Sequence, residues 1–212
     1  GAGVQKLAAG HYLHIRRGLP VPAPVQWWDL DFTRRITVKA KEAEEHLVEL
    51  LRAAVRSRMV ADVPLGAFLS GGVDSSAVVA LMAEASNKAV NSCAIGFDDA
   101  SLDETNYAEI IAKRFATDHR MRIVAADDFS LADMVAAHCD EPFADASALP
   151  TYRVSQLARE EVTVALSGDG ADEAFAGYRR LVFQHQEERA RRLIPGVVRR
   201  NLVGPLARAW PK

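Results

Sequence analysis

One loop of the sequence combines glycines, hydroxyls and a carboxylate in a pattern suited to binding phosphate, Ser70-Gly-Gly-Val-Asp-Ser-Ser76. It lies between two apolar segments, residues 65–69 and 74–85, which predict a buried strand followed by a buried helix. The glycines let the backbone turn sharply and approach a ligand. The first N–H groups of a helix have no partner within it and its dipole is positive there, so the loop predicts a phosphate or pyrophosphate site.

Asp74 places a carboxylate where this loop favours an anion. Its presence is explained if it holds Mg²⁺, which binds through carboxylates and shared phosphate oxygens. The simpler alternative is a Gly-Gly turn in which Asp74 is only a negative charge at a helix N-terminus. The loop is not a Walker A motif, because no Lys-Ser/Thr pair follows the glycines, and it lacks the spacing of a dinucleotide-binding fingerprint.

A second loop, Ser167-Gly-Asp-Gly-Ala-Asp-Glu173, has a similar composition. It follows a predicted strand, residues 162–166, and opens another helix. Parallel strands end at one edge of a sheet, where open α/β folds bind ligands, so we expect Asp172 to face Asp74 across a shared magnesium ion. The alternative is that the acidic residues of this loop only place negative charge at a helix N-terminus.

The elements that must position the two loops alternate along the chain. Apolar residues at every fourth position predict a helix over residues 41–60. Beyond it the sequence predicts strands at residues 65–69, 92–97, 119–125 and 162–166, and helices at residues 74–85, 101–117, 130–139 and 150–160. Ser101 and Glu104 fit a capping box at the start of one helix. Short apolar strands separated by helices predict an α/β fold, with a mostly parallel sheet covered by helices on both faces.

Composition excludes several other classes of protein. The formal net charge of −2 argues against a protein that mainly binds nucleic acid non-specifically. No apolar run approaches the ~20 residues that cross a bilayer, so we expect no membrane span. Cys93 and Cys139 are too few for a disulfide framework or a four-cysteine zinc site and favour a reducing, cytoplasmic setting.

The two loops together resemble a known family. Ser70-Gly-Gly-Val-Asp-Ser-Ser76 is similar to the PP-loop of ATP pyrophosphatases. Combined with Leu166–Glu173, Gly177-Tyr178 and the segment from Asp140 to Pro150, it resembles the synthetase domain of glutamine-dependent asparagine synthetases. The resemblance covers residues 40–190 and implies a fold like that of adenine nucleotide alpha hydrolases.

Residues 3–17 resemble the closing strand of the family's N-terminal glutaminase domain. The sequence from His11 to Arg17 alternates as a strand does, and a proline-rich connector, residues 18–24, follows it. We interpret residues 1–33 as the tail of that glutaminase domain plus a linker. Residues 34–212 are then an ATP-binding domain that stops before the family's later synthetase segments.

The resemblance implies adenylation of a substrate carboxylate by ATP, release of pyrophosphate and displacement of AMP by ammonia, with aspartate as acceptor and glutamine as the ammonia source. It implies Mg²⁺ as a cofactor, with Asp74 and Asp172 as its ligands. It implies a pyrophosphate site made of Ser70, Gly71, Gly72, Asp74 and Ser75. It implies an adenosine pocket lined by Phe68, Ile95, Ser167 and Gly168. Asp169 stands where some relatives carry a Glu proposed to shuttle a proton, and is the candidate catalytic residue.

Several alternatives stay open. The acceptor is aspartate or, as in β-lactam synthetases and amidotransferases that act on sugar-linked carboxylates, another carboxylate. A non-catalytic remnant would be indicated by loss of Asp74 or Asp172, and both are present. Neither cysteine stands at the position of the family's N-terminal nucleophile, so we expect this chain not to hydrolyse glutamine and leave open whether it is active alone. For Asp140, Glu141 and Asp145, substrate contact and loop structure are equal alternatives, and the oligomeric state, a homodimer included, stays open.

Overall fold

The structure, a computed structural model, describes residues 3–31, 33, 36–99, 101, 103–125, 130–140, 142–193, 196–198 and 201. The chain divides into two compact units, residues 1–47 and 48–212. The division falls within helix α1 (Ala40–Arg58), whereas the sequence predicts a domain boundary between residues 33 and 34. The assignment of residues 1–33 to a glutaminase tail stays a prediction.

The first unit contains a short antiparallel pair, β1 (His11–Tyr12) and β2 (Val25–Gln26). The backbone N–H groups of Trp27 and Trp28 both donate to the carbonyl of Gly10, at 2.9 and 3.2 Å, and extend the connection beyond the strands. The strand predicted over residues 11–17 therefore exists only at its first two residues, since Arg16 to Leu19 form a turn.

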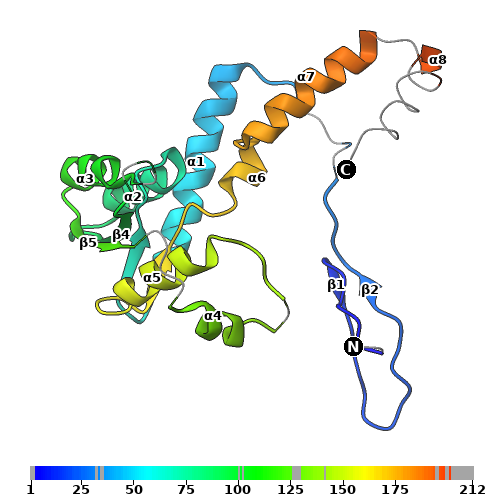
Figure 1. The fold of residues 1–212 in the computed structure, drawn as a ribbon, viewed down its shortest axis with the longest axis horizontal. Helices are drawn as coiled ribbons and strands as arrows, with labels where there is room; N and C mark the ends of the chain where they lie inside the picture. The colour runs from blue at the N-terminus through cyan, green and yellow to red at the C-terminus, as the bar shows by residue number, and fades with distance from the viewer. Residues whose placement is uncertain are drawn as a thin grey trace. The chain divides into compact units, whose positions relative to one another are not determined.

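The second unit is built on a four-stranded parallel sheet in the order β5-β4-β3-β6 (Figure 1). Its strands are β3 (Leu65–Phe68), β4 (Asn91–Phe97), β5 (Asp118–Val124) and β6 (Val164–Leu166). The helices that connect them are α2 (Val73–Ala85), α3 (Thr105–Arg114), α4 (Ala132–His138) and α5 (Ala148–Ala158). The predicted α/β fold with a parallel sheet is confirmed.

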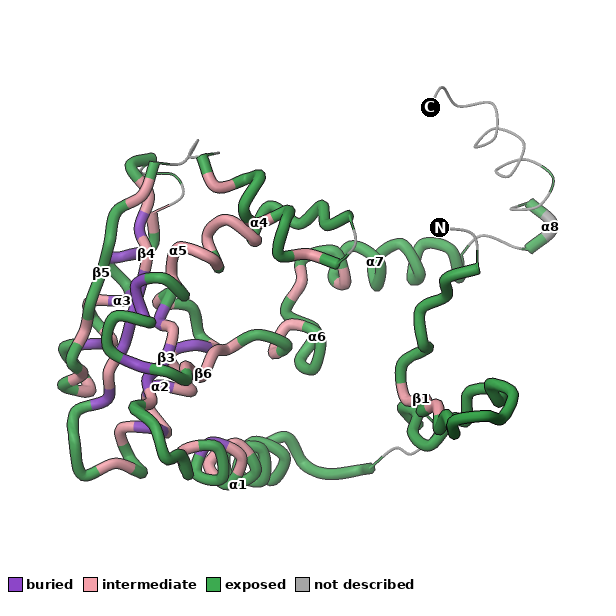
Figure 2. Tube along the Cα trace, turned by 90° about the horizontal axis from the view of Figure 1, so that it is seen from below, coloured by how far each residue is buried: buried purple, intermediate pink, exposed green. Residues whose placement is uncertain are grey.

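Side chains alternate between the two faces of the sheet and define two cores. Ala67 and Ala94 belong to a core shared with α1, α2 and α3, whose fully buried members include Val79 and Met82. Phe68 and Cys93, their neighbours in sequence, belong to the opposite core under α5, with Leu157. Burial is concentrated in the central strands and α2 (Figure 2). Helices on both faces, as predicted, follow from this period of two.

The strand order places the loops after β3 and β6 side by side. From β3 the chain moves outward through α2 to β4 and through α3 to β5, with both helices on one face. It then returns to the other side of β3, and α5 covers the opposite face. Crossovers between parallel strands are right-handed, so a reversal of direction along the sheet moves the helices to the other face. The reversal occurs at β3 and β6.

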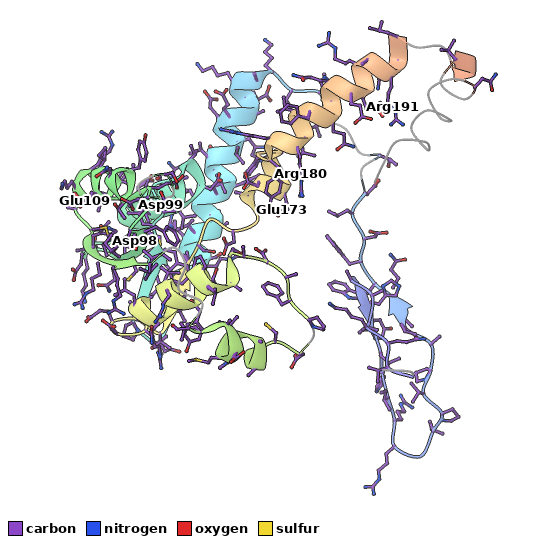
Figure 3. All side chains as sticks on the ribbon, in the orientation of Figure 1. Asp98, Asp99, Glu109, Glu173, Arg180 and Arg191 are labelled. Atoms are coloured by element: carbon purple, nitrogen blue, oxygen red, sulfur yellow. The ribbon has the colours of Figure 1, made fainter. Side chains whose placement is uncertain are left out.

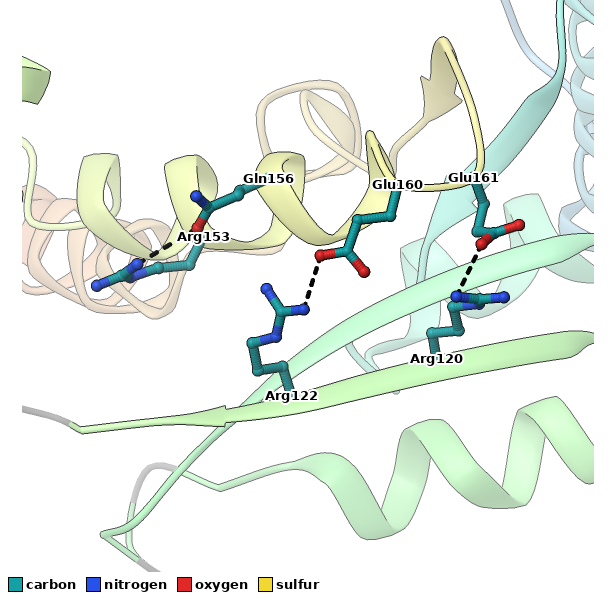
Figure 4. Close-up of polar contacts among 6 residues, drawn as sticks. All are labelled: Arg120, Arg122, Arg153, Gln156, Glu160 and Glu161. Atoms are coloured by element: carbon teal, nitrogen blue, oxygen red, sulfur yellow. Dashed lines mark hydrogen bonds and ion pairs between the residues drawn. The ribbon is translucent and has the colours of Figure 1, made fainter.

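Ion pairs connect edge strand β5 to the turn that follows α5 (Figure 4). Arg120 Nη1 lies 2.8 Å from Glu161 Oε1, and Arg122 Nη2 lies 2.7 Å from Glu160 Oε1. All four side chains are between a third and a half exposed. Surface pairs of this kind contribute little stability, about 0–1 kcal/mol each, so they align the strand and helix rather than hold the fold together.

The start of α3 differs from the sequence prediction. Ser101 donates to Asp99 Oδ1 through both its N–H and its Oγ, and Glu104 makes no side-chain cap. Asp103 instead accepts from Thr105, through N–H at 3.3 Å and Oγ1 at 2.8 Å. The predicted capping box of Ser101 and Glu104 is therefore wrong, because a nearer carboxylate satisfies the first free N–H group of the helix.

The helices α6 (Ala171–Phe175) and α7 (Arg179–Leu193) carry no buried side chains. A short helix, α8 (Gly196–Val198), is the last helix that the structure describes. Exposed i,i+4 ion pairs run along α7, from Glu187 to Arg191 and from Glu188 to Arg192. None of the described helices is both long enough and apolar enough to span a bilayer.

Met82 provides a test of the core around α2. Its side chain is fully buried, so Met82→Ala removes packed atoms and leaves a void. We expect the free energy of unfolding to fall by about 2–5 kcal/mol, measured by urea denaturation. Ile110→Ala, at a position 60% exposed, is the control and is expected to change it by less than about 1 kcal/mol. Equal losses would contradict the assigned core.

His119 gives the fold a defined pH dependence. Its Nδ1 lies 2.8 Å from Ser92 Oγ, which lies 2.8 Å from Thr117 Oγ1, and its buried Nε2 has no hydrogen-bond partner among the described residues. Burial lowers the pKa of His119 from its ordinary value, although the negative charge of Glu109 opposes this shift. Below the ordinary value, about 6.5, the unfolded chain binds a proton that the folded protein excludes. Stability therefore falls as the pH falls through that value.

We expect His119→Asn to reduce the loss of stability between pH 7 and pH 5, measured by urea denaturation at each pH. His138→Asn, at an exposed position whose Nδ1 lies near the carbonyl of Met134, is the matched control. An unchanged pH slope in His119→Asn would show that the imidazole is not kept neutral by the fold.

Candidate functional site

A cavity of about 580 Å³ opens at the carboxyl ends of β3, β4 and β6. Its volume lies within the roughly 300–1,000 Å³ typical of small-molecule sites. Four parts of the second unit meet there: the β3–α2 loop, the middle of β4, the start of α5, and the β6–α6 loop with the corner after α6. The lining residues are Phe68, Leu69, Ser70, Gly72, Asp74, Ser75, Cys93, Ala94, Ile95, Asp145, Ser147, Pro150, Thr151, Val154, Ser167, Gly168, Asp169, Gly170, Asp172, Glu173 and Tyr178.

The β3–α2 loop is shaped by its own hydroxyls. Ser75 Oγ accepts from the Ser70 N–H at 3.3 Å and donates to the Gly72 carbonyl at 3.2 Å. The two serine Oγ atoms lie 2.9 Å apart, and Ser70 Oγ also accepts from the Gly72 N–H at 3.3 Å. Ser70 and Ser75 line the cavity, but their contacts first determine the path of the backbone.

Gly71 is required by the turn. Its φ of +85° lies in the left-handed region, and a Cβ there would lie 2.6 Å from both Ala108 N and Tyr107 Cβ on α3. A side chain at this position would thus be strained and would press against a helix backbone. Gly71 is not among the residues that line the cavity, although the sequence predicts it in the pyrophosphate site.

The β6–α6 loop lies directly against the start of α2. A Cβ at Gly168 would lie 2.7 Å from Ser75 N and 3.0 Å from Asp74 Cβ, so only glycine allows this approach. The two loops that the sequence identifies are consequently one continuous surface. Gly170, with φ +90°, then begins α6 and brings Asp172 to the same cavity.

The structure brings the predicted site residues together, Gly71 excepted. Asp74 and Asp172 border one cavity, as do Phe68, the last residue of β3, and Ile95 within the neighbouring strand β4. Asp169 Oδ2 accepts from Ser167 Oγ at 3.0 Å, which orients the candidate catalytic carboxylate. The roles of these residues in binding nucleotide, metal and proton stay predictions.

The lining is strongly acidic. It holds five carboxylates, and none of the described lining residues is Lys, Arg or His. Backbone and side-chain donation from Ser147 lowers the pKa of Asp145, and donation from Tyr178 lowers that of Glu173, so both are ionised at neutral pH. A polyphosphate entering such a cavity would be repelled unless it brought cations with it.

The donor set fits magnesium better than a metal held by protein alone. In the described part of the chain, no three His, Cys, Asp or Glu side chains converge on one point. Mg²⁺ is commonly held by one or two carboxylates together with substrate phosphates and water. Asp74 and Asp172 would be such a pair, with the phosphates supplied by the ligand.

Sequence reasoning missed the wall made by α5. Ser147, Pro150, Thr151 and Val154 line the cavity and recur at the spacing of one helix face. The predicted helix began at Pro150, whereas α5 begins at Ala148 with Asp145 accepting from the Ser147 N–H at 2.9 Å. The sequence shows this helix face only in part, and its place beside the cavity follows from the strand order.

Two of the undecided candidates now have positions. Asp145 lines the main cavity and also a neighbouring cavity of about 450 Å³ between α4 and α5. Asp140 lines only the neighbouring cavity. Glu141 lies outside the described residues.

Comparison with known proteins identifies the family. The family model described as Asparagine synthase matches residues 46–212. The chain therefore belongs to the asparagine synthase family.

Curated relatives agree and are much longer. A Methanocaldococcus jannaschii protein provisionally named asparagine synthetase (glutamine-hydrolyzing) 2 is 46% identical over 154 residues, 72% of this chain and 30% of that protein. Asparagine synthetase (glutamine-hydrolyzing) 1 of Bacillus subtilis is 36% identical over 140 residues, 64% of this chain and 22% of that protein. The chain thus spans less than a third of the length of these relatives.

Among solved structures, the NH3-dependent NAD synthetase of Campylobacter jejuni superposes with a TM-score of 0.44 and 13% identity. The superposition covers 63% of this chain and 60% of that one.

Gly168→Ala tests whether the two loops must touch. The added Cβ would press on the α2 backbone and separate the loops, at a cost of about 1–3 kcal/mol of stability. We expect weaker binding of Mg-nucleotide, measured by isothermal titration calorimetry. Gly170→Ala is the comparison, because its Cβ meets nothing within 4 Å and only the positive φ is strained. Equal affinities in the two variants would show that the contact at Gly168 is not needed.

Proposed function

We propose that the protein containing this chain catalyses ATP-dependent amide formation, as an asparagine synthase of the glutamine-hydrolysing type. The second unit supplies the ATP-binding part. The observation that carries the proposal is the meeting of two acidic, glycine-rich loops in one cavity, at the point where the strand order reverses. Open α/β sheets bind ligands at this point, and membership of the asparagine synthase family supports the assignment.

The proposed reaction has two steps. A side-chain carboxylate oxygen of aspartate attacks the α-phosphorus of ATP, and pyrophosphate leaves as the acyl-adenylate forms. Ammonia then attacks the activated carbonyl carbon, the bond to AMP breaks, and asparagine forms. A free carboxylate is a poor electrophile, and adenylation supplies the leaving group that the amide bond requires.

In this proposal the chain's residues act mainly by position and charge. The N-terminal N–H groups of α2 bind the pyrophosphate part, and the Ser70–Ser75 contact holds their loop in place. Phe68 at the end of β3 and Ile95 in the C-terminal half of β4 border the adenosine. Asp74 and Asp172 would hold Mg²⁺, which when bound offsets the charge of the phosphates and of the departing pyrophosphate. Asp169, oriented by Ser167, is the proposed proton shuttle at amidation.

Ammonia is proposed to come from glutamine through a glutaminase domain of the same parent protein. The names of the Methanocaldococcus jannaschii and Bacillus subtilis relatives include glutamine hydrolysis, which supports this source. The free thiols Cys93 and Cys139 lie in the second unit and fit a reducing, cytoplasmic setting. Another carboxylate as acceptor is the alternative, and the choice of substrate in the experiment below decides it.

The decisive measurement is ATP–pyrophosphate exchange by the full-length protein with a panel of carboxylates. We expect exchange with aspartate and its loss by about 10²-fold or more in Asp74→Asn, since a group that stabilises developing phosphate charge has an effect of this size. Asp133→Asn, on exposed α4 and away from the cavity, is the matched control and is expected to retain exchange.

If no carboxylate supports exchange, the ligase assignment is refuted. If another carboxylate supports exchange and aspartate does not, the assignment of aspartate as the acceptor is refuted. Full exchange in Asp74→Asn would remove Asp74 from the metal site. Circular dichroism of each variant separates loss of chemistry from loss of fold.

A further inference from the structure

The helix that carries Asp172 has very little to hold it in place. α6 has only five residues, Ala171–Phe175, and none of them is buried. A helix of this length is not stable by itself, because its few hydrogen bonds do not offset the cost of nucleation. The direction of the Asp172 carboxylate must therefore be set by contacts at the ends of α6.

The C-terminal end of α6 is closed by a tight corner. Ala176 has a left-handed backbone, with φ +58° and ψ +38°, and the Gly177 N–H donates to the Asp172 carbonyl at 3.0 Å. A Cβ at Gly177 would overlap Asp172 Oδ1, so the carboxylate lies directly against the glycine. The corner thus contacts both the backbone and the side chain of Asp172.

Side-chain contacts also link the residues on the two sides of this corner. Tyr178 Oη donates to Glu173 Oε1 at 2.5 Å, across the turn that joins α6 to α7. The guanidinium carbon of Arg180 lies 4.4 Å from the centre of the Tyr178 ring, a cation–π distance. Figure 3 shows Glu173 and Arg180 together at this end of α6. Tyr178 is half-buried and borders the cavity beside Asp172 and Glu173.

We propose that Tyr178 is a positioning residue for the magnesium site: its bond to Glu173 holds α6 closed and so aims the Asp172 carboxylate at the cavity. The inference rests on the proposed function, because it deepens the role of Asp172 as a ligand of Mg²⁺. Groups that orient a metal ligand commonly change metal affinity by about 10–100-fold when they are removed.

Tyr178→Phe in the full-length protein tests the inference, because it removes the hydroxyl and keeps the ring under Arg180. We measure ATP–pyrophosphate exchange with aspartate at saturating ATP while free Mg²⁺ is varied. The half-saturating Mg²⁺ concentration is expected to rise about 10-fold, with the maximal rate largely recovered at high Mg²⁺. Tyr152→Phe is the matched control: its hydroxyl donates to Met134 Sδ at 2.8 Å, away from the cavity, and the Mg²⁺ dependence should not change.

Hydrogen–deuterium exchange of the peptide covering residues 171–178 gives a second readout that needs no turnover. The inference expects faster amide hydrogen exchange in this peptide of Tyr178→Phe, together with the shifted Mg²⁺ dependence of ATP–pyrophosphate exchange. Faster amide hydrogen exchange with an unchanged Mg²⁺ dependence of ATP–pyrophosphate exchange would mean that Tyr178 only stabilises the local structure, and would overturn the inference. An unchanged half-saturating Mg²⁺ concentration with a lower maximal rate would overturn it as well.

Failure of the proposed function has a different signature, since it is seen in the wild-type protein. If wild-type protein shows no exchange with any carboxylate, the proposed function fails and the inference fails with it. If wild-type protein shows exchange and only the variant result disagrees, the inference alone is overturned.

Discussion

The structure of the site depends on the close contact between the β6–α6 loop and the start of α2. β6 adds to the free side of β3, so the loops that follow these two strands leave from neighbouring positions. The absence of a side chain at Gly168 then lets one loop rest on Ser75 N. Residues nearly one hundred positions apart in sequence thereby share one cavity. Without this contact, the two helix N-termini that carry Asp74 and Asp172 would not border a common cavity.

The acidic lining determines which ligand charge the cavity can accept. The N-terminus of α2 favours an anion, yet the cavity around it holds five carboxylates and, in its described lining, no basic side chain. These features are compatible if the anion enters together with cations. A polyphosphate chelated by Mg²⁺ meets the condition, whereas a bare polyphosphate does not. The lining is therefore compatible with the proposed metal-bound nucleotide, and a phosphate-binding turn and a metal site are not exclusive alternatives at this cavity.

Most of the fold could be predicted because its signals are local. The strand β3 and the helix α2 are apolar runs bounded by Gly-Gly, and their predicted limits agree with the structure to within a residue. Both loops could be recognised because glycine and carboxylate together at a strand end are unusual. The start of α3 could not, because composition does not rank nearby candidate caps: Asp103 accepts from the Thr105 N–H, whereas Ser101 donates to Asp99. The wall made by α5 could not either, since its residues face the cavity only once the strand order is known.

The two proposed metal ligands are held by different means, and this difference matters for how the site would work. Asp74 stands in the first turn of α2, a helix of 13 residues anchored by the fully buried Val79 and Met82. Asp172 stands in a five-residue helix with no buried side chain, whose C-terminal end is closed by the corner at Gly177 and Tyr178. Local stability follows buried apolar contact, so α2 is the fixed side of the cavity and α6 the adjustable one. A ligand that bridges the two carboxylates would order α6 against α2, and the Tyr178–Glu173 bond reduces the ordering that binding has to supply.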